Sequence, residues 1–239
     1  MSIKLRLLLL IATSLLTALI VSLVSYVGNT RMSAAVSDDA VSMTALRNHM
    51  EADMMHDALR ADVYSAMLVG LGKSTGTAAE VRDSINEHAT HFRQVLDENL
   101  KLPVNPTIRA ALEHIKPSLD TYIEAAERIV GLALDNPDSA QRELGTFNSA
   151  FSQLEEQMAA LSELIESNTR ETSQATESAI HNANIALGVV LFASLLLLLA
   201  QGRWVTRSIM GPLKSANQIA QSIAHGNLSE PISEPTGKD

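Results

Sequence analysis

The sequence predicts an all-α membrane protein in which two transmembrane helices bracket an extracytoplasmic up-down four-helix bundle. Aromatic residues make up only 3% of the chain, and Ala, Leu, Met, Ser and Glu abound, which favours helices over strands. Two charge-free apolar runs are about as long as the roughly 20 residues that cross a bilayer. Between these runs, Gly- and Pro-rich breakers divide the chain into four stretches with helical patterning.

The first apolar run follows Lys4 and Arg6 in a short amino-terminal segment, residues 1–6. We predict a transmembrane helix over residues 7–28. A cleaved signal peptide also begins with basic residues, but this run is too long for one and no clear small-x-small site follows it. The second span is predicted over residues 183–202, where the block Leu195–Leu199 precedes Arg203.

Basic residues at both ends of the chain predict its orientation. Lys4 and Arg6 precede the first span, and Arg203, Arg207 and Lys214 follow the second, so both ends are expected in the cytoplasm. Residues 29–182 then form a periplasmic ligand-binding domain of a multi-pass inner-membrane protein. This middle segment is acidic and lacks a basic patch with aromatics, so nucleic acid is not an expected partner.

The four stretches of the middle segment are separated by Gly70–Gly76, Pro103–Pro106 and Asp135–Ser139. The outer two stretches are longer and run into the spans, so they are the ones that can transmit a shift across the membrane. Pro117 predicts at most a local kink. Apolar stripes are expected at Val81, Ile85, His88, Phe92, Val95 and Asn99, at Ile108, Leu112, Ile115, Leu119, Tyr122, Ala126 and Ile129, and at Leu144, Phe147, Phe151, Leu154, Met158, Leu161 and Ile165.

The first stretch has three faces when its residues are placed 100° apart. We expect the bundle core to take one apolar side, formed by Met43, Leu46, Met50, Met54, Ala61, Tyr64 and Leu68. The second apolar side, formed by Ala52, Met55, Leu59 and Ala66, suggests a symmetric dimer contact. A polar stripe separates the two and contains His49, Asp53, His56, Arg60 and Met67.

The residues after the second span resemble a HAMP domain in their order and spacing. Pro212 and Leu213 stand at a helix start, small residues and Ile follow on one face, and Gly226 and Leu228 stand at the exit. Residues 203–239 would be the amino-terminal part of this domain, which stays incomplete. With the spans and the four stretches, nearly the whole chain resembles the amino-terminal half of a methyl-accepting chemotaxis protein with a four-helix-bundle sensor.

This resemblance implies a homodimeric transmembrane chemoreceptor. It would sense an extracytoplasmic small molecule and pass the signal through HAMP to a cytoplasmic module beyond this sequence, which engages the chemotaxis kinase and its coupling protein. Sensor histidine kinases and diguanylate cyclases share the same front end and form the alternative. A structural membrane coiled coil without a ligand is a third hypothesis.

In the family, ligands bind near the dimer interface, where arginines grip carboxylates. The resemblance therefore points to Arg60 as an anion-binding residue, with His49, Asp53 and His56 beside it on the polar stripe. An ordinary helix-surface ion pair between Arg60 and a nearby acid is the competing interpretation.

Metal binding and catalysis have weaker support in the sequence. His49, Asp53 and His56 have a spacing that could coordinate a divalent metal, with His88 or His91 as further ligands, but paired helical histidines are often plain polar residues. We expect no metal and no other cofactor. The chain has no cysteine and offers no arguable catalytic triad or phosphate loop, so no enzymatic activity is expected.

Overall fold

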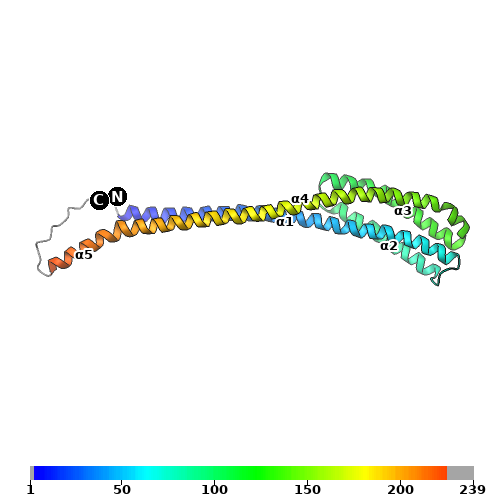
Figure 1. Cartoon of the computed structure of the whole chain (residues 1–239), viewed down its shortest axis with the longest axis horizontal. Helices are drawn as coiled ribbons and strands as arrows, with labels where there is room; N and C mark the ends of the chain where they lie inside the picture. The colour runs from blue at the N-terminus through cyan, green and yellow to red at the C-terminus, as the bar shows by residue number, and fades with distance from the viewer. Residues whose placement is uncertain (1–2, 225–239) are drawn as a thin grey trace. The chain divides into compact units, whose positions relative to one another are not determined.

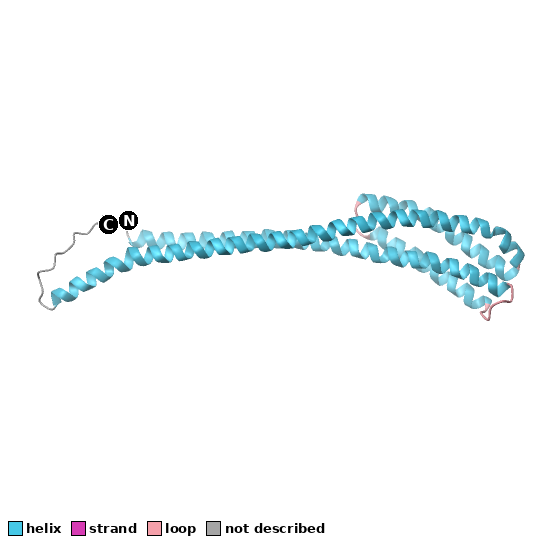
Figure 2. Ribbon diagram, in the orientation of Figure 1, coloured by secondary structure: helices cyan, strands magenta, loops and turns pink. Residues whose placement is uncertain are grey.

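A computed structural model describes residues 3–224, and these residues are helical throughout except for short loops (Figure 1). The elements are α1 (Ile3–Gly70), α2 (Ala78–Lys101), α3 (Pro106–Asp135), α4 (Pro137–Val205), the π-helix η1 (Thr206–Met210) and α5 (Gly211–Ala224). No strand occurs in this described range, and the loops of Figure 2 join bundle helices. The predicted all-α class is confirmed.

The chain divides into two compact units. One is the four-helix bundle, residues 34–177, and the other combines residues 1–33 with residues 178–239. Both α1 and α4 contribute to each unit, whereas α2 and α3 belong to the bundle alone.

Helix ends in the bundle follow the predicted breakers. Thr77 caps α2 by accepting from the Glu80 amide, and the Glu80 carboxylate accepts from the Thr77 amide in return. Asn105 caps α3, whose first residue is Pro106, a position where the missing amide hydrogen costs nothing. Gly72 follows α1 with a φ of 66°, a left-handed conformation that favours glycine.

Gly70 is the last residue of α1 and has no room for a side chain. A Cβ at this position would lie 1.8 Å from the carbonyl oxygen of Ala133 in α3. The missing Cβ lets the two backbones approach, and this approach closes the end of the bundle where α1 turns into α2.

The bundle core confirms the predicted stripes on α3 and α4. Every residue of the α3 stripe is buried, and so is every residue of the α4 stripe except Leu144, which packs against the core from its edge. On α2 the stripe is buried apart from His88, which is half-buried. Tyr122, Phe92 and Phe147 are the largest fully buried side chains and form the centre of the core.

The predicted core face of α1 is wrong. Met43, Met50, Met54, Tyr64 and Leu68 are exposed. The core instead takes the opposite side, which supplies Ala52, Leu59, Val63 and Ala66, so the dimer contact predicted for this side is also wrong.

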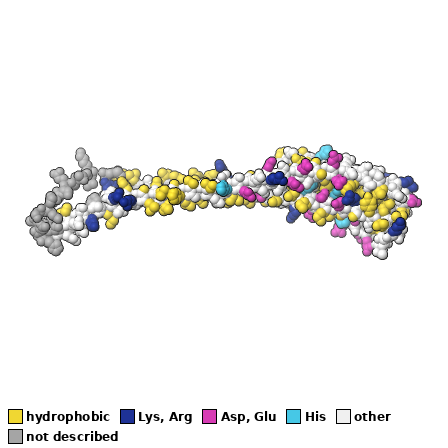
Figure 3. Space-filling model, viewed as in Figure 1, with side chains coloured by type: hydrophobic (Ala, Val, Ile, Leu, Met, Phe, Trp, Pro, Cys, Tyr) yellow, Lys and Arg dark blue, Asp and Glu magenta, His cyan; other side chains and the backbone are white. Residues whose placement is uncertain are grey.

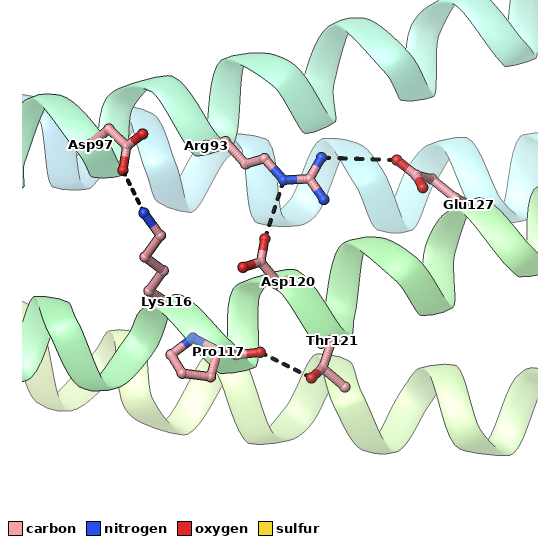
Figure 4. Close-up of polar contacts among 7 residues, drawn as sticks. All are labelled: Arg93, Asp97, Lys116, Pro117, Asp120, Thr121 and Glu127. Atoms are coloured by element: carbon pink, nitrogen blue, oxygen red, sulfur yellow. Dashed lines mark hydrogen bonds and ion pairs between the residues drawn. The ribbon is translucent and has the colours of Figure 1, made fainter.

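Pro117 leaves α3 a single helix from Pro106 to Asp135. The Thr121 hydroxyl donates to the Pro117 carbonyl at 2.9 Å (Figure 4). The sequence predicted at most a local kink at Pro117, and the continuous helix agrees with this prediction.

Ion pairs join the outer faces of α2 and α3 (Figure 4). Arg93 Nε lies 3.2 Å from Asp120 Oδ1, and a second guanidinium nitrogen lies 4.0 Å from Glu127 Oε1. Lys116 Nζ lies 3.0 Å from Asp97 Oδ1. All five side chains are more than two-fifths exposed, so each pair stabilises the bundle by at most about 1 kcal/mol.

In the second unit, α1 and α4 contain stretches long and apolar enough to cross a membrane. Figure 3 shows hydrophobic side chains along these stretches, while Asp and Glu gather on the bundle. Gly28 lies beside Ala183, and the Gln201 amide donates to the Thr13 hydroxyl. The Thr13 hydroxyl in turn donates to the Leu9 carbonyl of its own helix, so the amide-hydroxyl bond joins the two apolar helices at one level.

Helix α4 passes into α5 through the π-helix η1. Pro212, in the first turn of α5, has no amide hydrogen and cannot donate to the Ser208 carbonyl four residues earlier. The Arg6 guanidinium donates to this carbonyl at 2.7 Å instead. Leu213 also lies in the first turn of α5, whereas the predicted HAMP positions Gly226 and Leu228 lie outside the described residues.

Candidate ligand-binding region

Arg60 lies on the bundle surface beside α4. Its Nη2 donates to the Asp57 carboxylate at 2.8 Å, and its Cζ lies 4.2 Å from the centre of the Phe151 ring. The Arg60 side chain is 41% exposed, so the guanidinium keeps access to solvent. The surface ion pair considered above is thus present, and the cation-π contact orients the guanidinium against α4.

His56 lies one helical turn before Arg60 but is only 2% exposed. Its ring stacks on Phe151 with 4.1 Å between centroids, and Nε2 lies 3.3 Å from the Phe151 carbonyl oxygen. The buried Tyr122 hydroxyl donates to the His56 carbonyl at 2.7 Å. His56 therefore joins α1 to both α3 and α4.

His49 lies one heptad before His56 and is also buried, at 5% exposure. Burial lowers the pKa of both imidazoles below 6.5. Nearby carboxylates and a backbone carbonyl of α4 oppose this effect at each site but do not reverse it. Both rings are accordingly neutral near pH 7 and act as packed, hydrogen-bonding residues of the core.

The structure does not bring the predicted metal-ligand set together. Asp53 is exposed, whereas His49 and His56 are buried. Among residues 3–224, no group of three or more His, Asp or Glu side chains could hold a metal ion. His88 and His91, the further candidates, each pair with an acid of α1 instead.

Those acids are Asp62 and Glu51, which sequence reasoning did not assign. Asp62 is nearly buried and lies 2.6 Å from His88 Nδ1, and Glu51 lies 2.7 Å from His91 Nε2. Burial raises the pKa of Asp62, and the bond to His88 opposes this rise. No common spacing links the two pairs, because the acids lie eleven residues apart on α1 and the histidines three apart on α2, so the sequence carried no signal for this pairing.

A polar network joins α1 and α4 below the apolar core. Asn168 donates to the Ser42 hydroxyl at 2.8 Å, and the Ser173 hydroxyl donates to Asp39 at 2.7 Å. Further along, the Thr176 hydroxyl donates to the Ala35 carbonyl at 3.0 Å. These short side chains replace the apolar contacts of the core, so the two helices leave the bundle through hydrogen bonds rather than through packed hydrocarbon.

An apolar seam stays exposed along α1. We call it the α1 seam; its large members fall on a repeat that steps alternately by four and three residues, as in a coiled coil, while Ala40, Arg47, Asp57 and Ala61 occupy the remaining positions of that repeat. Each large member is between 43% and 66% exposed: Val36, Met43, Met50, Met54, Tyr64, Leu68 and Leu71. Asp57 occupies one position of the same repeat, and its partner Arg60 flanks the seam. Arg60 therefore lies at the edge of an uncovered apolar surface.

Comparison with known proteins agrees with this architecture. Searches of curated proteins and of solved structures found no match. The family model described as a four helix bundle sensory module for signal transduction matches residues 1–183, more than half of the chain. This match spans α1, α2, α3 and the bundle part of α4. The chain thus belongs to the family of four-helix-bundle sensory modules found in methyl-accepting chemotaxis proteins.

Proposed function

We propose that this chain is the front end of an inner-membrane chemoreceptor, with its bundle in the periplasm and no enzymatic activity of its own. The observation that supports this most is the continuity of α1 and α4, which run for 68 and 69 residues from the bundle into apolar stretches. A displacement of either helix in the bundle is thereby transmitted along one rigid element.

The receptor acts as a homodimer that pairs through the α1 seam. Large apolar side chains in a coiled-coil repeat are rarely left in water, and a second copy of α1 would cover them symmetrically. Asp57 interrupts this repeat, and Arg60 flanks it as residues at the edge of a coiled coil do. The dimer would therefore enclose the Asp57–Arg60 pairs of both copies.

The ligand of this site is a small anion held by Arg60. Such an anion would replace the Asp57 carboxylate on a guanidinium already oriented over Phe151. In this proposal His56 positions Phe151 by stacking on its ring. His49 supports the same α1–α4 contact one heptad away. Asp53 contributes negative charge that selects against weakly bound anions.

Occupancy would shift α4 relative to α1 and pass to a HAMP relay after the second span. Pro212, Leu213, Gly226 and Leu228 are the residues assigned to that relay. An effector that binds two receptor states with different affinity typically supplies about 1–3 kcal/mol of coupling free energy. The hydrogen-bonded segments where α1 and α4 leave the bundle can shift by this amount of energy without disrupting the core. The signal then reaches a chemotaxis kinase through its coupling protein.

A chimeric receptor tests this proposal. Residues 1–210 are joined to the HAMP and signalling parts of a characterised chemoreceptor in a cell without other receptors, and kinase activity is followed while small carboxylic acids are added. We expect a response to at least one acid, and its loss in Arg60→Gln but not in Arg82→Gln, a matched exposed arginine paired weakly with Asp135. A response that survives Arg60→Gln refutes the anion site, and a chimera that inserts but never changes kinase activity refutes the receptor role.

A further inference from the structure

A groove lies between α3 and α4, on residues that the proposed anion site does not use. Its volume is about 440 Å³, within the roughly 300–1,000 Å³ range of small-molecule sites. Ala111 and Ala160 stand on its two sides, and Ile115, Leu161 and Leu164 supply apolar surface. A larger side chain at either alanine would fill the space.

Every polar side chain that lines the groove can accept a hydrogen bond. Glu156 lines it with a carboxylate, and His114, Gln153 and Gln157 complete the lining. No Lys or Arg lines the groove. Lys116, the nearest cation along α3, is paired with Asp97 of α2. The lining therefore carries negative formal charge.

Gln157 provides the most specific observation. Its side-chain oxygen Oε1 is buried and accepts no hydrogen bond from the described residues. A buried acceptor without a donor is unfavourable, so the position favours a partner that brings an N–H group. The neighbouring Glu156 carboxylate favours a donor that is also positively charged.

We propose that the α3–α4 groove binds a small organic amine as its ammonium ion. The ammonium donates to the Glu156 carboxylate and, after a rotation of the Gln157 side chain that turns its buried Oε1 into the groove, to that oxygen as well. A short branched hydrocarbon body lies on Ile115, Leu161 and Leu164. The alanines on both sides leave room for a body of this size.

The groove touches the element that matters for signalling. Helix α3 ends inside the bundle, whereas α4 continues to Val205. A ligand that bridges the two would bias the position of α4, so an amine would act as a second input beside the anion. This signalling consequence rests on the proposed function, but the binding claim does not.

Isothermal titration of the full chain in lipid nanodiscs tests the site, with empty nanodiscs as the blank. The probes are 3-methylbutylamine, the matched anion 3-methylbutyrate and the neutral 3-methylbutanol. We expect saturable binding of the amine alone. Glu156→Gln and Gln157→Leu should each weaken it on the order of tenfold, since each removes a hydrogen bond to the ammonium. Ala160→Phe should abolish it by filling the groove.

Glu163→Gln serves as the matched control, because Glu163 is an exposed acid of α4 outside the groove, and its affinity should stay within about twofold. Circular dichroism verifies that each variant is folded. No saturable amine binding to the folded chain, equal binding of 3-methylbutyrate, or undiminished binding in Glu156→Gln and Ala160→Phe would each overturn the proposal. None of these results bears on the chimeric receptor, so the two proposals fail separately.

Discussion

Acidification should destabilise the bundle through the two buried histidines of α1. Burial lowers the pKa of His49 and His56 in the folded state, whereas the unfolded chain keeps the ordinary value of 6.5. As the pH falls below 6.5, the unfolded chain binds more protons than the folded one. Full stability is therefore present above about pH 7 and is lost as the pH falls from 6.5 towards the lowered folded-state pKa.

The size of the loss follows from the proton linkage. One pH unit below 6.5, a histidine that stays neutral in the folded state costs about 1.4 kcal/mol of unfolding free energy, so the pair costs up to about 3 kcal/mol. For a domain of this size, that loss lowers the midpoint of thermal unfolding by roughly 5–10 °C. The Asp53, Asp57, Glu155 and Glu166 carboxylates make the loss smaller, because they attract the proton in the folded state.

The assay is thermal unfolding of the full chain in nanodiscs, followed by circular dichroism at about pH 7.5 and about pH 5.5, the window set by the linkage. The double variant His49→Gln/His56→Gln should lose most of the difference between the two midpoints, because glutamine cannot be protonated. The control His181→Gln replaces an exposed histidine and should keep it. An unchanged pH difference in the double variant would refute the reasoning, whatever its absolute stability. Asp62, whose raised pKa acts in the opposite direction, is present in all the variants and cancels in the comparison.

Three further substitutions test the packing by the same unfolding measurement. Gly70→Ala should lower the unfolding free energy by about 2 kcal/mol or more, on the order of other overpacked sites, because its Cβ would overlap a backbone carbonyl. At the control position, the Cβ of Gly131→Ala meets nothing within 4 Å, so stability should be unchanged or rise by about 0.5–1 kcal/mol. Equal effects of the two substitutions would contradict the close approach at Gly70. Tyr122→Phe should cost about 0.5–1.5 kcal/mol by removing the hydroxyl that donates to the buried His56 carbonyl in addition to the helical amide, and a neutral result would rule that bond out. Arg93→Ala should change stability by less than about 1 kcal/mol, and a larger loss would show that its exposed pairs act as a network.

Sequence patterning predicted the architecture because each signal was local. Breakers such as Gly72, Pro106 and Pro137 set the helix ends, and three-four stripes on α3 and α4 marked core faces that had no competitor. On α1 two apolar faces competed. Periodicity weighed Met50 and Leu59 alike, and only packing against three neighbouring helices decides that Leu59 is buried and Met50 exposed.

The contacts of the candidate site could be predicted only in part, for a related reason. Arg60 was singled out from its position on a helix, but its contact with Phe151 joins residues far apart in the chain. His56 was grouped with the polar stripe, although an imidazole can satisfy a carbonyl inside a core as well as contact water. The groove between α3 and α4 arises from alanines on separate helices, and no single-helix pattern reveals such a pair.

Arg6, which precedes the first apolar stretch, also has a consequence for the junction after α4. Because Pro212 withholds an amide hydrogen, the Ser208 carbonyl depends on a side chain from the start of the other span. The π-helix η1 and the hydrogen bond from Arg6 together connect the end of α4 to the start of α1. The junction therefore involves both apolar helices and not α4 alone. Rotation of α4 at this level must therefore stretch or break a charge-assisted bond to α1, so this bond is sensitive to the relative position of the two helices and insensitive to motions that they share.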